Sequence, residues 1–469
     1  MAEVNKDIKI EPINGSGFRI FALPPKYFAA FAAIVLLSAM LGVLPAGMAG
    51  CFAFMIVCGA ILQELGDHLP IVNTFLGGGP VVIIFGMGYL RYMNFFGVFD
   101  VISGLIAKPG FTATLMKNID TFFKPTGAFL DFYIAALITG SILGMNRKLL
   151  VKAAARYFPA IFGAIAVSFG LVAIAGQMSG FGVVKAILLI ALPIMGGGMG
   201  AGAVPLSKIF ESSGTMTAEQ AISIMNPAVA IGNATSIVLA GLLTKILVGK
   251  FLNGQGALMK AGAGDDPSEF EISPEMQAKR DHVTVTNLGI GLLAATSFFA
   301  WGYIVAGVWI KLVPSVNIHA YAWMIISVAI CKIFNLLPEF IEVDCYQWFQ
   351  FVMKNLTSML MVGIGLCYLS LDVVIESFSM MYLLMCFLAC IGAFIGAGLV
   401  GSFVGFYPVE AGITAGLCMS NMGGTGDVAV LSAAHRMELM PFAQISSRLG
   451  GAIILIMGSL MLSTLGSML

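Results

Sequence analysis

The sequence predicts an all-α polytopic membrane protein with an inverted repeat and two re-entrant hairpins. Apolar residues make up 59% of the 469 residues and charged residues only 10%, whereas soluble domains carry about 25% charged residues. The mean hydropathy is +0.97. Two long apolar stretches each contain three glycines in four positions, Gly197-Gly198-Met199-Gly200 and Gly423-Gly424-Thr425-Gly426. This composition excludes a soluble globular core, and the net charge of zero does not indicate nucleic-acid binding.

The lengths of the apolar stretches predict the number of membrane spans. A helix needs about 20 apolar residues to cross the hydrocarbon layer, and this requirement predicts eleven transmembrane helices. They are expected near residues 26–44, 47–65, 77–94, 130–145, 158–176, 224–247, 286–310, 319–336, 355–372, 380–405 and 442–467. The polar residues 1–25 are expected to form a cytoplasmic tail, and residues 26–46 to contain the first transmembrane helix.

The segments 183–207 and 411–435 do not fit as simple spans, because they contain the two glycine signatures. Glycine costs about 1 kcal/mol relative to alanine inside a helix. Non-helical backbone at membrane depth is tolerated only where protein or water covers it. Each segment is therefore predicted to be a re-entrant hairpin with an irregular tip. The alternative is that the glycines only allow helices to pack closely.

Lysines and arginines orient the predicted spans, because cytoplasmic loops carry an excess of them. They gather before the first span, between the fourth and fifth spans, and in the polar segment 249–285. This pattern predicts a cytoplasmic N-terminus and an outside C-terminus, although the expected outside loop 95–129 also carries lysines. Segment 249–285 becomes a cytoplasmic linker between a first inverted repeat, 47–248, and a second, 286–469. The two hairpins then enter the membrane from opposite faces.

The two glycine signatures are predicted to form an anion site. Each precedes a short helical segment, Ala203 to Ser207 after the first and Ala429 to Ser432 after the second. The start of a helix presents free N–H groups and the positive end of its dipole. Broken backbone at matching places in two halves of a membrane protein is typical of a transporter's binding site.

Arg448 is the charged residue that most strongly indicates a ligand. It begins the last apolar run, where a charge costs at least a few kcal/mol and usually faces a cavity. Its planar guanidinium suits a carboxylate, so we expect it to bind a substrate carboxylate. The alternative is that Arg448 pairs with a protein carboxylate, with Asp427 and Glu410 as candidates.

Hydroxyl and amide groups surround the second glycine signature and indicate a sodium site. Oxygen ligands with few full charges suit Na⁺, as in other transporters with unwound helices. Each residue taken singly also fits a local hydrogen-bonding cap. The group consists of Asn421, Thr425, Gln444, Ser446 and Ser447. Eight cysteines without metal-ligand spacing and four dispersed histidines give no support to metal catalysis.

The chain resembles the 2-hydroxycarboxylate transporters, which include citrate and malate symporters. The resemblance rests on PIMGGGMGAGAVPLS at 193–207, NMGGTGDVAVLS at 421–432 and AQISSRLGG at 443–451. It implies eleven spans, two opposed hairpins and a homodimer. It also implies that one domain carries the substrate across by an elevator-like movement against a dimerisation domain.

The resemblance also implies a set of binding residues. The substrate is expected to contact Arg448 and the backbone at Met199, Gly200, Gly424 and Thr425. One sodium ion is expected at Ile194, Gly197, Met419 and Asn421, and a second near Cys418, Thr425 and Ser447.

Two positions depart from the citrate symporters that this chain resembles. Met199 stands where they have asparagine, and Met422 stands where they have arginine. A hydrogen bond to a charged group contributes roughly 1.5–3 kcal/mol. The missing arginine should weaken the grip on a third carboxylate, which favours a dicarboxylate such as malate over citrate.

These observations predict a secondary active transporter and not an enzyme. It would take up a 2-hydroxycarboxylate, malate or citrate, together with Na⁺ across a bacterial inner membrane. A proton-coupled transporter and a precursor/product exchanger, with malate or citrate against lactate, are alternatives within this class. The membrane subunit of a sodium-pumping decarboxylase is an alternative from another class, against which Arg448 argues.

Overall fold

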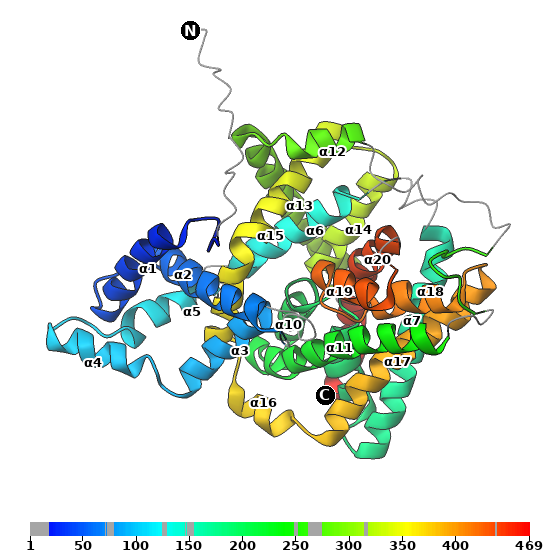
Figure 1. The fold of residues 1–469 in the computed structure, drawn as a ribbon, viewed down its shortest axis with the longest axis horizontal. Helices are drawn as coiled ribbons and strands as arrows, with labels where there is room; N and C mark the ends of the chain where they lie inside the picture. The colour runs from blue at the N-terminus through cyan, green and yellow to red at the C-terminus, as the bar shows by residue number, and fades with distance from the viewer. Residues whose placement is uncertain are drawn as a thin grey trace, which may run out of the picture.

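The computed structural model describes most of the chain as helix (Figure 1). The described residues are 18–70, 72, 79–123, 129–145, 147, 154–247, 252–260, 274–313, 318–436 and 439–469. Within them the chain forms two isolated β-bridges and no strand. Residues 1–17 of the predicted tail lie outside the described residues.

Seven helical segments of the described chain are long and apolar enough to cross a membrane, so the protein is a polytopic membrane protein. These segments contain α2 (Met48–His68), α7 (Ala154–Ser179), α11 (Ala218–Ile246), α13 (Val285–Leu312), α15 (Glu339–Cys367), α17 (Met380–Phe403) and α21 (Gly451–Leu465). Shorter helices occupy the other predicted spans: α1 (Pro25–Met40), α3 (Gly79–Tyr92), α6 (Phe129–Leu143) and α14 (Ala320–Ile333). The number of eleven spans therefore stays a prediction.

The predicted span 355–372 was wrong at its start, since α15 begins at Glu339. Charged residues interrupt the apolar run in the first half of this helix. Glu339 and Glu342 lie in its first turn, where acidic side chains interact favourably with the helix dipole. Lys354 lies in the middle of the helix and lines a cavity, so its charge does not face lipid.

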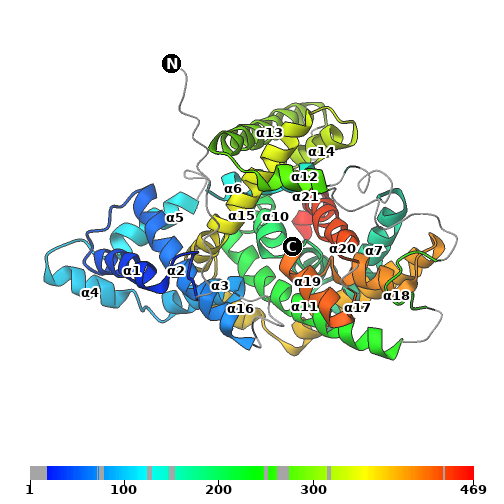
Figure 2. The same cartoon turned by 45° about the horizontal axis from the view of Figure 1, so that its top comes forward.

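The helices form two groups by their packing. Both views show α1 to α5 at one end of the molecule and α7, α17 and α18 at the other (Figures 1 and 2). The scaffold group consists of α1 to α6 and α12 to α15, including α4 (Gly97–Leu105), α5 (Lys117–Phe123) and α12 (Pro274–Asp281). Within it, α15 packs against α2, α3, α6 and α13. The hairpin group consists of α7 to α11 and α17 to α21, and its centre is the packing of α7 against α17. The short helix α16 (Leu371–Ser377) connects the groups.

Two helical hairpins lie within the hairpin group. Hairpin 1 runs through α8 (Val183–Ala186), α9 (Leu192–Ile194) and α10 (Val204–Ser212). Hairpin 2 runs through α18 (Pro408–Ala411) and α19 (Gly424–Ala434). The first arm of each contains a π-helical turn, Ile187–Ala191 in hairpin 1 and Gly412–Leu417 in hairpin 2.

Each hairpin follows one of the two long helices that pack together, hairpin 1 after α7 and hairpin 2 after α17. Helix α20 (Met440–Ile445) follows hairpin 2, and a π-helical turn over Ser446–Gly450 joins it to α21. Such turns occur frequently at functional sites. Each hairpin therefore lies between two long helical segments, hairpin 1 between α7 and α11 and hairpin 2 between α17 and α21.

Candidate anion site at the hairpin tips

The tips of the two hairpins contact each other through glycine backbone. Gly197, Gly198 and Gly423 have φ angles of +80°, +108° and +76°, a region that glycine adopts without a steric penalty. A Cβ atom on Gly198 would lie 2.8 Å from the Met422 carbonyl oxygen, and one on Gly423 would lie 3.1 Å from that of Gly197. The glycines therefore both form the turns and allow the close approach of the tips.

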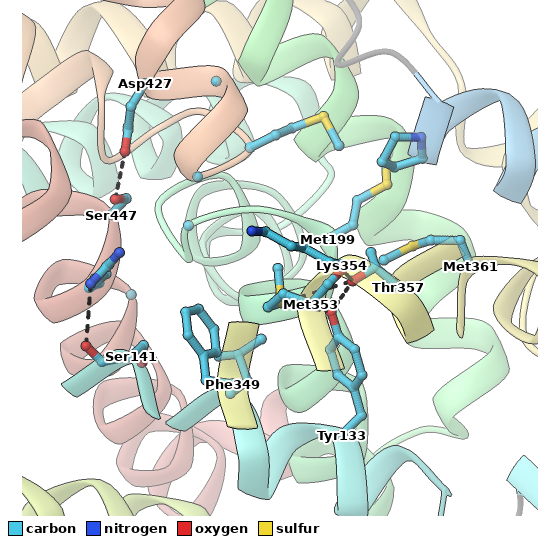
Figure 3. Close-up of a pocket in the computed structure, with 18 of the residues that line it drawn as sticks. Tyr133, Ser141, Met199, Phe349, Met353, Lys354, Thr357, Met361, Asp427 and Ser447 are labelled. Carbon is cyan, nitrogen blue, oxygen red and sulfur yellow. Dashed lines mark hydrogen bonds between the residues drawn. The ribbon is translucent and has the colours of Figure 1, made fainter. Parts of the chain in front are cut away.

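Side-chain hydrogen bonds hold the tip of hairpin 2. The Asn421 Oδ1 accepts from the Gly423 N–H at 2.7 Å, and the Asn421 Nδ2 donates to Asp427 at 3.0 Å. The Ser447 hydroxyl donates to the other oxygen of Asp427 at 2.8 Å (Figure 3). From α11, Asn233 accepts from the Met422 N–H at 3.1 Å. The local capping role considered for Asn421 is thus present at Gly423. Ser447 instead bonds the fully buried Asp427, which lies 20 residues earlier in the chain.

Arg448 lies in the π-helical turn next to this network and faces the scaffold group. Its Nη1 lies 3.5 Å from the carbonyl oxygen of Ser141 in α6 (Figure 3). Among the residues that the structure describes, no carboxylate oxygen lies within 4.0 Å of the Arg448 guanidinium. The guanidinium is therefore free to bind an anion from the cavity.

Glu410, the more distant candidate partner of Arg448, has different partners. It accepts from the backbone N–H groups of Gly254 at 2.8 Å and Gly256 at 3.2 Å. It also lies 3.5 Å from the Nε of Arg436. Glu410 thus ties hairpin 2 to the linker segment 252–260 and does not reach Arg448.

A cavity of about 1230 Å³ separates the hairpin tips from the scaffold group (Figure 3). Its wall on the hairpin side contains Gly197, Met199, Met422, Gly423, Asp427, Ser447 and Arg448. Its wall on the scaffold side is formed mainly by α6 and α15, with Tyr133, Ser141, Phe349, Gln350, Lys354, Thr357 and Ser358 among the lining residues. The volume exceeds the 300–1,000 Å³ usual for small-molecule sites, so a small organic anion would leave room for water.

Two of the five predicted substrate residues line this cavity, and the structure describes the other three by their backbone alone. Met199 and Arg448 line the cavity. Gly200 follows Met199 in the π-helical turn Met199–Ala203, and Gly424 and Thr425 begin α19. The side chain of Thr425 lies outside the described part of the structure.

The predicted sodium residues cluster at and behind the tips. Gly197 and Ser447 line the cavity. The side chains of Ile194, Cys418, Met419 and Asn421 are fully buried behind it. Met419 packs against Gly450, and Ile194 against Gly232, so the apolar members of this set pack in the protein interior.

The polar residues of the scaffold wall were not among the site residues predicted from the sequence. Gln350, Lys354, Thr357 and Ser358 repeat at helical spacing on α15, so they share one face. Thr357 also hydrogen-bonds the Tyr133 hydroxyl of α6 at 2.8 Å. The helical spacing of these polar residues could have indicated a cavity-facing surface. Lys354 was missed because the predicted span began at residue 355.

The profile of the 2-hydroxycarboxylate transporter family matches residues 20–460. The chain belongs to the 2-hydroxycarboxylate transporter family. A citrate/sodium symporter of Salmonella typhimurium is 37% identical over 453 residues, which cover 95% of each chain. A malate transporter of Lactococcus lactis, MleP, is 35% identical over 460 residues, or 97% of this chain and 99% of MleP. A citrate transporter of Leuconostoc mesenteroides, CitP, is 35% identical over 436 residues, or 93% and 92%.

Membership of the 2-hydroxycarboxylate transporter family confirms the resemblance found in the three sequence motifs. The relatives are transporters, so this member of the family is a membrane transporter and not an enzyme. That result argues against the membrane subunit of a sodium-pumping decarboxylase.

Proposed function

We propose that this transporter takes up a 2-hydroxycarboxylate together with Na⁺. The observation that carries the proposal is Arg448, which faces the cavity at the meeting point of two glycine tips with no carboxylate partner among the described residues. An unpaired guanidinium at membrane depth is costly, and a bound carboxylate would satisfy it with two parallel hydrogen bonds.

The backbone of the tips would complete the anion site. The helix α19 begins at Gly424, and its first N–H groups lack partners inside the helix. Together with the backbone at Met199 and Gly200, Gly424 and Thr425 would contact the anion through these groups and the positive end of the helix dipole.

The sodium ions would bind behind the tips as cargo coupled to the anion. One sodium ion would be bound by Ile194, Gly197, Met419 and Asn421. The other would be bound by Cys418, Thr425 and Ser447. The support for this assignment is Asp427, whose carboxylate hydrogen-bonds both Asn421 and Ser447. Asp427 adds a full negative charge to ligand sets that are otherwise neutral, and a cation would compensate that buried charge.

The substrate would be malate in preference to citrate. Met422 lines the cavity and offers no charge at the position of the arginine in the citrate symporters. Relatives named for citrate with sodium and for malate are similarly close, at 37% and 35% identity, so identity does not choose between the two acids.

The transporter would work by an elevator mechanism, in which one domain carries the substrate across the membrane against the other. The proposal includes eleven spans, opposed re-entrant hairpins at 183–207 and 411–435, and inverted repeats at 47–248 and 286–469. It also includes a homodimer in a bacterial inner membrane, with the N-terminus inside and the C-terminus outside. The support is the division into two helix groups with the cavity between them, since one group could then move the site past the other.

The test is uptake by the purified full chain in liposomes. Malate, citrate and lactate are supplied in turn, with an inward Na⁺ gradient, with an inward proton gradient, and with neither. We expect Na⁺-dependent uptake of malate above citrate. Uptake driven only by the proton gradient would establish proton coupling instead. Malate uptake only into liposomes preloaded with lactate would establish exchange.

A further inference from the structure

We propose that Lys354 forms a second carboxylate subsite, on the scaffold wall of the cavity. The inference rests on the proposed function, since it concerns how a dicarboxylate is held. Arg448, on the hairpin group, would bind one carboxylate, and the Lys354 ammonium would bind the other from α15. The substrate would then bridge the two helix groups.

The position of Lys354 requires an explanation. It lies midway along α15, one of the seven helices long and apolar enough to cross a membrane. A lysine at this depth is costly unless it faces water or a partner. Its side chain is exposed to the cavity, and Figure 3 shows it extending from α15 into that space. Among the described residues no carboxylate pairs with it.

The carboxylates that also line the cavity have other partners. Glu64 lies 3.3 Å from the Nδ1 of His68. Asp67 accepts from the Gln63 amide at 2.8 Å and from the Gly79 N–H at 3.0 Å. Asp427 accepts from Asn421 and Ser447. The Lys354 ammonium is therefore left for an anion that enters from solution.

The neighbours of Lys354 suit a hydrogen-bonding ligand. Gln350, Thr357 and Ser358 lie on the same face of α15 and line the same cavity. Their amide and hydroxyl groups donate and accept hydrogen bonds. A polar stripe of this kind inside an apolar helix is typical of a surface that contacts water or a polar substrate.

The charge balance favours two cationic groups. Malate carries two negative charges at neutral pH, and Arg448 compensates one of them. A second carboxylate transferred from water without a partner costs free energy, and Met422 cannot provide that partner from hairpin 2. Lys354 provides it from the opposite side of the cavity. A monocarboxylate such as lactate would need Arg448 alone.

The test compares a dicarboxylate with a monocarboxylate in liposomes. The measurements are the KM of malate uptake and the inhibition constant of lactate, for wild type, Lys354→Gln and Lys354→Arg. We expect Lys354→Gln to raise the malate KM by about tenfold to a hundredfold, as for a lost hydrogen bond between charged groups. The inhibition constant of lactate should change less than threefold. Lys354→Arg should return the malate KM most of the way to the wild-type value. The matched control is Lys311→Gln, because Lys311 is exposed at the end of α13 away from the cavity lining.

Two outcomes would overturn the subsite. One is a malate KM within twofold of wild type in Lys354→Gln. The other is an equal rise of the malate KM and of the lactate inhibition constant, which would indicate that Lys354 has a structural role. Should wild type transport none of the acids, the proposed function fails, and the subsite is tested by binding alone.

Amine labelling of the wild-type protein supplies that binding test without any substitution. An amine-reactive reagent is added with Na⁺ and with malate, lactate or neither, and the modified lysines are quantified by peptide mass spectrometry. We expect malate to reduce the labelling of Lys354 at least threefold, lactate to reduce it little, and Lys311 to be unaffected by either. Equal labelling of Lys354 with and without malate would contradict the proposal.

Discussion

The two hairpin tips form similar turns in different ways. The tip of hairpin 1 is held by backbone conformation and close packing, with Gly197 and Gly198 at positive φ against the backbone of Ser447 and Met422. The tip of hairpin 2 is held by the side chains of Asn421 and Asp427. The difference separates two roles: hairpin 1 provides a shape that only glycine fits, and hairpin 2 provides the charge and the oxygen atoms. Four substitutions test this division, beginning with the residue beside both tips.

Arg448→Ala should have the largest effect, a loss of malate uptake of more than a hundredfold, because it removes the one cationic side chain proposed to bind the substrate from the hairpin wall. The measurement is initial uptake in liposomes at matched amounts of folded protein. Arg448→Lys is the control and should recover part of the activity, since it restores the charge without the planar fork. Unchanged kinetics in Arg448→Ala would remove Arg448 from the site and leave both tips without a ligand.

Gly198→Ala tests the tip of hairpin 1. At Gly198, with φ +108° and ψ −176°, alanine costs about 1–3 kcal/mol in backbone strain, and its Cβ would lie 2.8 Å from the Met422 carbonyl oxygen. We expect uptake to fall about thirtyfold and the melting temperature to fall with it. Gly182→Ala is the matched control, because Gly182 has similar dihedral angles, φ +94° and ψ 137°, but no atom within 4 Å of its added Cβ.

The control separates strain from contact. If both glycine variants lose the same amount of uptake, strained backbone alone accounts for the effect. If neither loses uptake, the close contact of the tips is not required for transport.

Asp427→Asn tests the charge of hairpin 2. The substitution removes a buried negative charge that accepts from Asn421 and Ser447. We expect the Na⁺ concentration for half-maximal malate uptake to rise about tenfold, because a cation at these ligands would lose its compensating charge. Asp372→Asn, at an exposed aspartate of α16, is the control. A tenfold rise in the malate KM at saturating Na⁺, without a change in the Na⁺ dependence, would place Asp427 in the anion site instead.

Met422→Arg should have the smallest effect. It adds a cation at the cavity edge of hairpin 2, where Met422 is half-buried. We expect the ratio of citrate to malate uptake, compared as kcat/KM, to rise about fivefold, since citrate has a third carboxylate to bind. The control is Met361→Arg, which adds the same charge to the scaffold wall of the same cavity, away from hairpin 2. A similar rise in both variants would show that the charge of the cavity, and not hairpin 2, selects the acid.

Parts of the fold could be predicted and others could not, for identifiable reasons. A helix lies at every predicted span, but the start of α15 was misplaced, because a hydropathy sum treats a cavity-facing lysine like a lipid-facing one. Similarly, Glu410 was a candidate partner of Arg448 until the backbone of Gly254 and Gly256 proved to be its partner. From the sequence, Asp427 was a candidate partner of Arg448 only. Its hydrogen bonds to Asn421 and Ser447 could not be predicted, because no sequence pattern indicates that these side chains meet.

The sequence by itself determined the membrane class, the places where the backbone turns and one charged residue, Arg448, beside the tips. These are local properties: apolar length, the conformational freedom of glycine, and an arginine beside them in an apolar run. Only the tertiary structure decided that the two tips touch, that no described carboxylate oxygen lies within 4.0 Å of the Arg448 guanidinium, and that Lys354 faces the same cavity. Each of these facts depends on which faces of distant helices meet, and side-chain direction at long range is settled by packing.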